Sequence, residues 1–194
     1  MIKHIRSLSI FSLACIFLVL SLLASVVMFF LLTGKVNLFY TGFALDSQGR
    51  LYVGKASKID VWEDGRYITS ISPQTSHGYA FTIQHDSILL AANSSLYTMD
   101  LSGNILTQKE DAHTQEYNRL YAQRKRFTQT DGVSYRSQNC MGYYTISCMD
   151  TQNDEPIYRM PLLDYAIKIL CVVTYVSWAI YILIMIIRFW RWRV

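Results

Sequence analysis

The stretch Gly42–Ile71, GFALDSQGRLYVGKASKIDVWEDGRYITSI, decides the fold of the central part of this chain. Short alternations of apolar and polar residues are interrupted there by two turn sequences, Asp46-Ser47-Gln48-Gly49 and Glu63-Asp64-Gly65. Alternation with a period of two, bounded by turns that contain Asp and Gly, is typical of β-strands joined by hairpins. The stretch therefore predicts four strands with three tight connections.

The same succession of four short strands returns twice further along the chain. We place the repeats at residues 42–72, 79–109 and 126–161, and the third is the least regular. A four-stranded unit that returns about every 40 residues has the length of a β-propeller blade. A plain antiparallel meander or a small barrel, with strands of the same length, is the alternative. The polar and basic segment between the second and third repeats, residues 110–125, is expected to be a connector.

The sequence ALDSQGRLYVGKASKIDVWEDGRYI, residues 44–68, resembles the NHL and related six-bladed β-propeller repeats. The shared features are a strand, a D-x-x-G turn, an LYV strand and a short turn, and the resemblance extends over residues 43–161. It implies that three blades form half of a ring. An incomplete ring exposes a strand edge and an apolar face, and two-fold symmetry is the commonest in homo-oligomers. We therefore expect a homodimer or higher homo-oligomer, completed by self-association.

Two uncharged apolar segments flank the repeats, from Leu8 to Leu32 and from Ile169 to Ile187. About 20 helical residues cross a bilayer core of about 30 Å, so we expect two transmembrane helices, over residues 8–32 and 163–187. The first apolar segment is longer than the roughly 7–15 residues of a signal peptide, and no clean small-x-small cleavage pattern follows it. It is therefore expected to be an uncleaved signal anchor, with a cleaved signal peptide as the alternative.

The charges beside these segments predict the orientation of a multi-pass protein in the cell membrane. The chain has a net charge of +4, and its two ends hold basic residues but no acidic ones. Because positive flanks stay in the cytoplasm, we expect residues 1–7 and 188–194 there and an all-β domain, residues 33–162, outside. The expected anchors at the membrane interface are Lys3, Arg6, Lys168, Arg188, Trp190, Arg191, Trp192 and Arg193. Interleaved Arg and Trp are ordinary in a lipid-headgroup region, so no nucleic-acid partner is expected.

No catalytic, cofactor-binding or metal-binding constellation stands out in the sequence. Its histidines occur singly, and no Ser/His/Asp arrangement is evident, so neither an enzyme nor a cofactor is expected.

Cys140 and Cys148 both lie in the domain that we expect outside, where oxidation is permitted. Because the register of their hairpin is unknown from the sequence, a local Cys140–Cys148 disulfide and two free thiols remain equal alternatives.

Four cations gather near the connector, at Arg119, Arg124, Lys125 and Arg126. Charges of a solvated linker are the simpler interpretation, and a patch that contacts lipid headgroups or an acidic partner is the sharper one.

We expect a membrane-anchored extracytoplasmic binding or assembly module that recognises a ligand or a partner, including another membrane protein. The alternatives are a membrane enzyme subunit with a loop-built site on a propeller face, and an oligomeric pore or transporter component.

Overall fold

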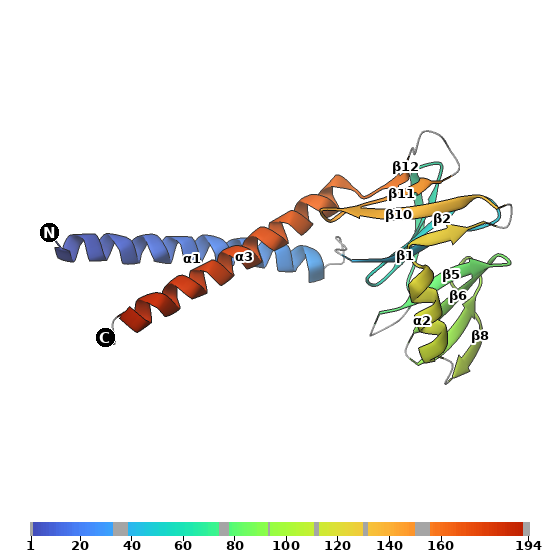
Figure 1. Ribbon diagram of the computed structural model, residues 1–194, viewed down its shortest axis with the longest axis horizontal. Helices are drawn as coiled ribbons and strands as arrows, with labels where there is room; N and C mark the ends of the chain where they lie inside the picture. Colours follow the sequence, from blue (N-terminus) through green and yellow to red (C-terminus); the bar gives the residue numbers. More distant parts are fainter. Residues whose placement is uncertain are drawn as a thin grey trace. The chain divides into compact units, whose positions relative to one another are not determined.

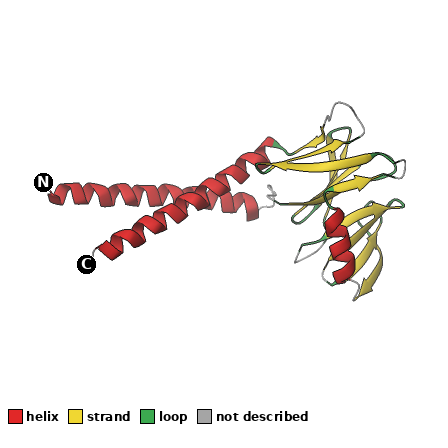
Figure 2. Ribbon diagram, viewed as in Figure 1, coloured by secondary structure: helices red, strands yellow, loops and turns green. Residues whose placement is uncertain are grey.

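The computed structural model describes residues 2–32, 39–73, 78–92, 94–110, 113–129, 132–149 and 156–191. The chain divides into two compact units. One unit comprises Met1–Val36 and Leu162–Val194, and the other comprises Asn37–Pro161. The first unit is helical and the second is mostly β (Figure 2).

The helical unit contains α1 (Ile2–Leu32) and α3 (Leu162–Arg191), which pack against each other. Neither helix contains Gly or Pro, and α3 begins directly after Pro161 with Asp164 in its first turn. A carboxylate is favoured there because the N-terminus of a helix carries a partial positive charge. Between the helices, the ring of Phe17 lies edge-to-face on Trp178 at a centroid distance of 5.0 Å.

Among the residues that the structure describes, one helix is long and apolar enough to cross a membrane. Within α3, Leu162–Ile187 meets the requirement with a mean hydropathy of 2.4. In α1 the apolar stretch found among the described residues is Cys15–Phe29, which is shorter than a span requires. The structure therefore supports one membrane helix where the sequence predicts two, because fewer apolar positions of α1 than of α3 are described.

The β domain contains three four-stranded antiparallel sheets, each with its strands in sequential order (Figure 1). Sheet 1 consists of β1 (Tyr40–Leu45), β2 (Leu51–Lys55), β3 (Ile59–Glu63) and β4 (Arg66–Ile71). Sheet 2 consists of β5 (Ala80–Gln84), β6 (Ser87–Ala92), β7 (Ser95–Met99) and β8 (Ile105–Glu110). Sheet 3 consists of β9 (Arg126–Thr128), β10 (Ser134–Cys140), β11 (Tyr143–Cys148) and β12 (Pro156–Arg159). Three sheets of four strands are the arrangement that the repeats predict.

Sheet 1 is the middle layer of the domain. On one side it shares the main apolar core with sheet 2, where Ile59 and Val61 join Phe81 and Leu90 in one buried cluster. On its other side, aromatic rings join it to sheet 3. Tyr40 stacks on Tyr144 at 4.4 Å, and Trp62 meets Tyr158 edge-to-face at 5.3 Å. Such ring pairs stabilise by about 1 kcal/mol beyond the area they bury.

The predicted connector contains a helix, α2 (His113–Gln123). It packs on β5, β6 and β7 (Figure 1). Leu120, which is 1% exposed, sits against Ala80 and Ala91 on the face of sheet 2 that points away from sheet 1. The helix therefore covers the outer apolar face of sheet 2. The layers are α2, sheet 2, sheet 1 and sheet 3.

The propeller interpretation is not supported. In a propeller each blade packs its apolar faces against neighbouring blades. Here α2 covers the outer face of sheet 2, and the outer face of sheet 3 carries Arg126, Arg136 and Arg159. Neither outer face is thus a bare apolar surface that needs another blade. The homodimer stays a prediction, without the half-ring on which it was based.

Candidate functional site

The first strands of the three sheets meet around a groove. β1, β5 and β9 are each the end strand of their sheet, and β1 contacts both of the others. The groove between them has a volume of about 630 Å³. It is lined by Phe43, Phe81, Thr82, Ile83, Gln84, Ala122, Gln123, Arg124, Lys125, Arg126, Phe127 and Thr128. Its floor is aromatic, its rim is basic, and none of these lining residues is acidic.

A close approach of two backbones forms one wall of the groove. The turn after α2 lies on β1 at Gly42, where a Cβ atom would be 3.1 Å from the Cβ of Arg124. Gly42 also has a φ of +153°, which residues with side chains rarely adopt. Directly after β9 in the chain, the Gln129 side chain donates a hydrogen bond to the carbonyl oxygen of Asp46 at 3.1 Å. These two contacts hold β9 beside β1.

Asp46 itself is part of a turn that recurs in the domain. Its buried carboxylate accepts hydrogen bonds from the backbone N–H groups of Gln48 and Arg50 and from Nε of Arg50 at 2.7 Å. Asp100 accepts equivalent bonds from Ser102 and Asn104. These hydrogen bonds satisfy backbone N–H groups of each turn. The bonds to Asp46 also fix the end of β1, the strand that borders the groove.

The four cations predicted as a patch have different surroundings. Arg119 is ion-paired with Glu116 at 2.8 Å on the exposed surface of α2. Arg124 ends α2: it donates to the carbonyl oxygen of Tyr121 at 3.2 Å, and its guanidinium lies 3.3 Å from the centre of that ring. A cation is favourable at a helix C-terminus, so Arg124 has a structural role there. Lys125 and Arg126 are exposed on the groove.

The register of sheet 3 adds cations that the sequence did not indicate. Arg136 lies directly opposite Arg126, and Arg159 lies opposite Thr145 on the same outer face. Like charges directly opposite each other are destabilising in a sheet. Within the described residues, Nε of Arg136 is buried without a hydrogen-bond partner. The basic rim therefore continues from the groove onto the outer face of sheet 3.

The charge of Arg124, which lines the groove, also acts on the phenol of Tyr144 in β11. Burial raises the pKa of Tyr144 to about 12, and the nearby charge of Arg124 acts in the opposite direction. In sheet 1, burial together with the charge of Asp46 raises the pKa of Tyr52 to about 12. Both phenols are therefore neutral at physiological pH, and the charge of the groove comes from its cations.

The two cysteines of the β domain, Cys140 and Cys148, are not joined in a disulfide. Cys140 lies opposite Tyr143, whereas Cys148 lies opposite Tyr135, five positions along β10 from Cys140. The two side chains also point to opposite faces of the hairpin, because they belong to opposite pairs in the alternation. This separation is too large for a disulfide without movement of the backbone, so the register favours the free-thiol alternative.

The predicted membrane anchors lie largely outside the described side chains. Lys168 is described, and it is half-buried on α3 four residues after Asp164. For Lys3, Arg6, Arg188, Trp190 and Arg191 the structure gives the helix backbone alone, and Trp192 and Arg193 fall outside the described residues. Over the part of the chain that is described, no group of three or more His, Cys, Asp or Glu side chains could hold a metal ion.

Fold and site together define a β-rich protein with an apolar helix long enough for a membrane and a basic, aromatic groove. No family model and no curated protein matches the chain. A solved structure of a protein of unknown function from Bacteroides caccae matches with 11% identity and a TM-score of 0.28. The match covers 64% of this chain and 61% of that one, so the chain spans less than two thirds of its length. A similarity of this size carries no argument about function.

Proposed function

We propose that the protein is a membrane-tethered binding module whose β domain binds an extended, acidic segment of a partner protein. The observation that carries the proposal is the groove itself, whose lining combines the rings of Phe43, Phe81 and Phe127 with the exposed residues Lys125 and Arg126. Its volume of about 630 Å³ is in the range of ligand sites. An aromatic floor under a basic rim fits a ligand with apolar and acidic groups in alternation.

The extended form of the ligand is supported by the strands that line the groove. β5 and β9 are end strands, and an end strand presents backbone N–H and C=O groups to an added strand. A peptide that pairs with such an edge gains main-chain hydrogen bonds, and its alternate side chains enter pockets. Acidic side chains on the solvent side of that peptide then face Lys125 and Arg126, and the attraction speeds encounter.

We propose that α1 crosses the membrane together with α3, because its sequence is uncharged from Leu8 to Leu32 and it packs along α3. The positive ends of both helices then stay in the cytoplasm. The β domain faces the outside, and its partner is an extracytoplasmic segment.

The test uses the full chain in detergent and a fluorescein-labelled peptide of alternating Glu and Val, with a Lys-Val peptide for comparison. The double variant Lys125→Glu/Arg126→Glu is expected to weaken binding of the acidic peptide at least about tenfold, since each charged contact is worth about 1.5–3 kcal/mol. Higher salt weakens binding to the unmodified protein. Fluorescence anisotropy measures both effects.

The matched control is Lys109→Glu, which reverses an exposed charge on β8, a strand outside the groove. It should leave binding unchanged. Equal affinity for the Lys-Val peptide, or equal loss in the control, would remove the groove as the binding site.

A further inference from the structure

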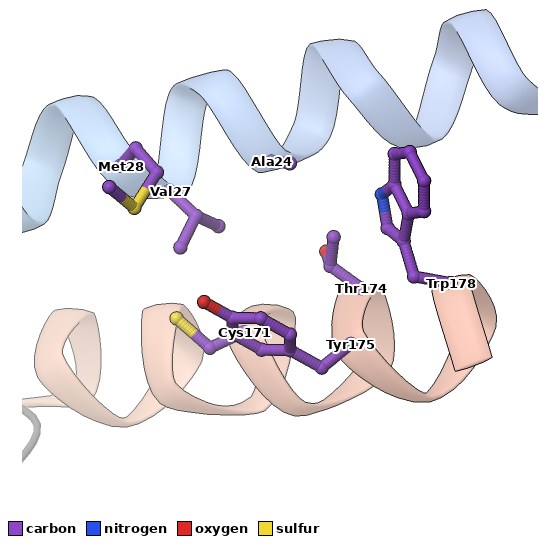
Figure 3. A pocket seen from close by; sticks show the side chains of 7 residues that line it. All are labelled: Ala24, Val27, Met28, Cys171, Thr174, Tyr175 and Trp178. Atoms are coloured by element: carbon purple, nitrogen blue, oxygen red, sulfur yellow. The ribbon is translucent and has the colours of Figure 1, made fainter.

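The helical unit contains a second cavity, which the proposed function does not use. It lies between α1 and α3, has a volume of about 370 Å³, and is lined by Ala24, Val27, Met28, Cys171, Tyr175 and Trp178 as well as Thr174 (Figure 3). None of these residues is charged. The volume is in the range of small-molecule sites, and the lining is almost wholly apolar.

One polar group in the cavity is unsatisfied. Thr174 is 4% exposed, and within the described residues its Oγ1 has no hydrogen-bond partner. Figure 3 shows its side chain pointing from α3 toward α1. A helical threonine often bonds a carbonyl of the preceding turn, but Thr174 does not. A buried hydroxyl without a partner is unfavourable because it has lost its hydrogen bonds to water, and a ligand oxygen in the cavity would restore one such bond.

The depth of the cavity restricts the ligand. Thr174 is 12 residues after Leu162 (174 − 162) and 13 before Ile187 (187 − 174), at the middle of the apolar segment. At 1.5 Å per residue it lies roughly 18–20 Å from either end. Ester carbonyls of bilayer lipids stay near the headgroups, so they do not reach this level. The ligand is a molecule that dissolves in the hydrocarbon core.

We infer that the cavity binds a neutral, lipid-soluble carbonyl compound of the quinone type, with its carbonyl oxygen on the hydroxyl of Thr174. The lining offers donors to such an oxygen, because a threonine hydroxyl and the indole N–H of Trp178 both donate. The flat ring of a quinone fits beside Trp178 and Tyr175, where aromatic faces stack. The remaining walls, Ala24, Val27 and Met28, contact the apolar substituents.

The experiment titrates the full chain, in nanodiscs of phosphatidylcholine, with a decyl-substituted benzoquinone. Quenching of tryptophan fluorescence reports binding because Trp178 lines the cavity. Saturable quenching is expected, and Thr174→Val, which keeps the shape but removes the hydroxyl, should weaken quinone binding roughly 5–10-fold, the loss of one hydrogen bond. Ala24→Phe, which fills the cavity, should abolish saturation. Ser177→Ala is the matched control, because it removes a hydroxyl of α3 outside the cavity, and it should bind as the unmodified protein does.

The outcomes separate this inference from its alternatives. Saturable competition by diacylglycerol as effective as by the quinone would assign the site to a lipid ester and overturn the quinone assignment. Equal affinity of the Thr174→Val protein and the unmodified protein, or quenching that never saturates, would also overturn it. So would a dimer that Thr174→Val dissociates, because the hydroxyl would then be satisfied by a second copy. Binding of the acidic peptide to the β domain is unaffected by either helix variant, so the two proposals fail independently.

Discussion

A single phenol holds the turn between β2 and β3. Tyr79 is 1% exposed, and its hydroxyl lies 2.6 Å from the carbonyl oxygen of Lys55 and 2.7 Å from that of Lys58. It also accepts a hydrogen bond from the backbone N–H of Lys55 at 3.1 Å. Burial raises the pKa of Tyr79 well above its usual range, so the hydroxyl keeps its proton and remains a donor.

Removal of this hydroxyl leaves buried backbone groups without their partner. Tyr79→Phe is therefore expected to lower the free energy of unfolding by about 2 kcal/mol. Urea unfolding of the full chain in detergent, followed by tryptophan fluorescence, measures the change. Tyr97→Phe is the control, because Tyr97 is half-buried at the edge of the same core. An equal loss in both variants would show that the three contacts of Tyr79 carry no special weight.

A second residue-scale contact makes stability depend on pH. Asp86, in the turn after β5, accepts hydrogen bonds from Oγ and N–H of Ser47, in the turn after β1, at 2.8 and 3.1 Å. These hydrogen bonds lower the pKa of the Asp86 carboxyl below its ordinary range. A lowered folded-state pKa gives stability that is present above the ordinary carboxyl pKa of about 4 and is lost as pH falls through the lower value.

The melting temperature should consequently fall on acidification below about pH 4, and Asp86→Asn should flatten that part of the profile. Differential scanning calorimetry across acidic pH tests this expectation. Asp64→Asn removes a carboxylate from an exposed turn of sheet 1 and should leave the slope as it is. A profile that is equally steep with Asn at position 86 would exclude this contact as its source.

At the scale of elements, α2 is stabilised by its packing on sheet 2. Leu120→Ala removes the side chain that is buried against Ala80 and Ala91, at an expected cost of about 2–4 kcal/mol. The loss concentrates in the helix, so hydrogen exchange of His113–Gln123 should accelerate while that of β6 changes less. Asn118→Ala, on the exposed surface of α2, is the control. Uniform acceleration over the whole domain would show that helix and sheets unfold as one unit.

The sequence predicted the strands well because their turns have local causes. Gly49 and Gly65 occupy the predicted turns with φ of +80° and +73°, a conformation that glycine adopts without strain. The sequence missed α2 because residues 110–125 are polar. A weak signal was present in Tyr117, Leu120 and Tyr121, whose spacing of three and four residues places them on one helical face.

The candidate sites were less accessible to prediction. The sequence singled out Lys125 and Arg126 because they are neighbours in the chain, whereas Arg136 joins them only through the strand register. Once the strand pairing is known, the face of the sheet on which each cation lies is also known, since opposite residues share a face. Thr174 gave no sequence signal, because an isolated threonine in a membrane helix ordinarily bonds its own backbone. Both observations needed the packing of distant segments.

For the whole molecule, the repeats establish three sheets but not how the sheets pack. Their outer faces differ: α2 covers one, and arginines occupy the other. Because one outer face is covered by a helix and the other carries charged side chains, the domain does not need a second copy to bury apolar surface. Its orientation across the membrane is then the property with the greatest functional consequence, because it decides which partners can reach the groove.

Cys140 offers a direct test of that orientation. Its thiol is free and exposed in the β domain, whereas Cys15 and Cys171 belong to α1 and α3. A membrane-impermeant maleimide added to intact cells is therefore expected to label the protein, and Cys140→Ala should lose most of the label. Cys148→Ala, at a half-buried thiol, should retain most of it. Labelling that appears only after the membrane is permeabilised would place the domain in the cytoplasm, where an extracytoplasmic partner for Lys125 and Arg126 could not bind.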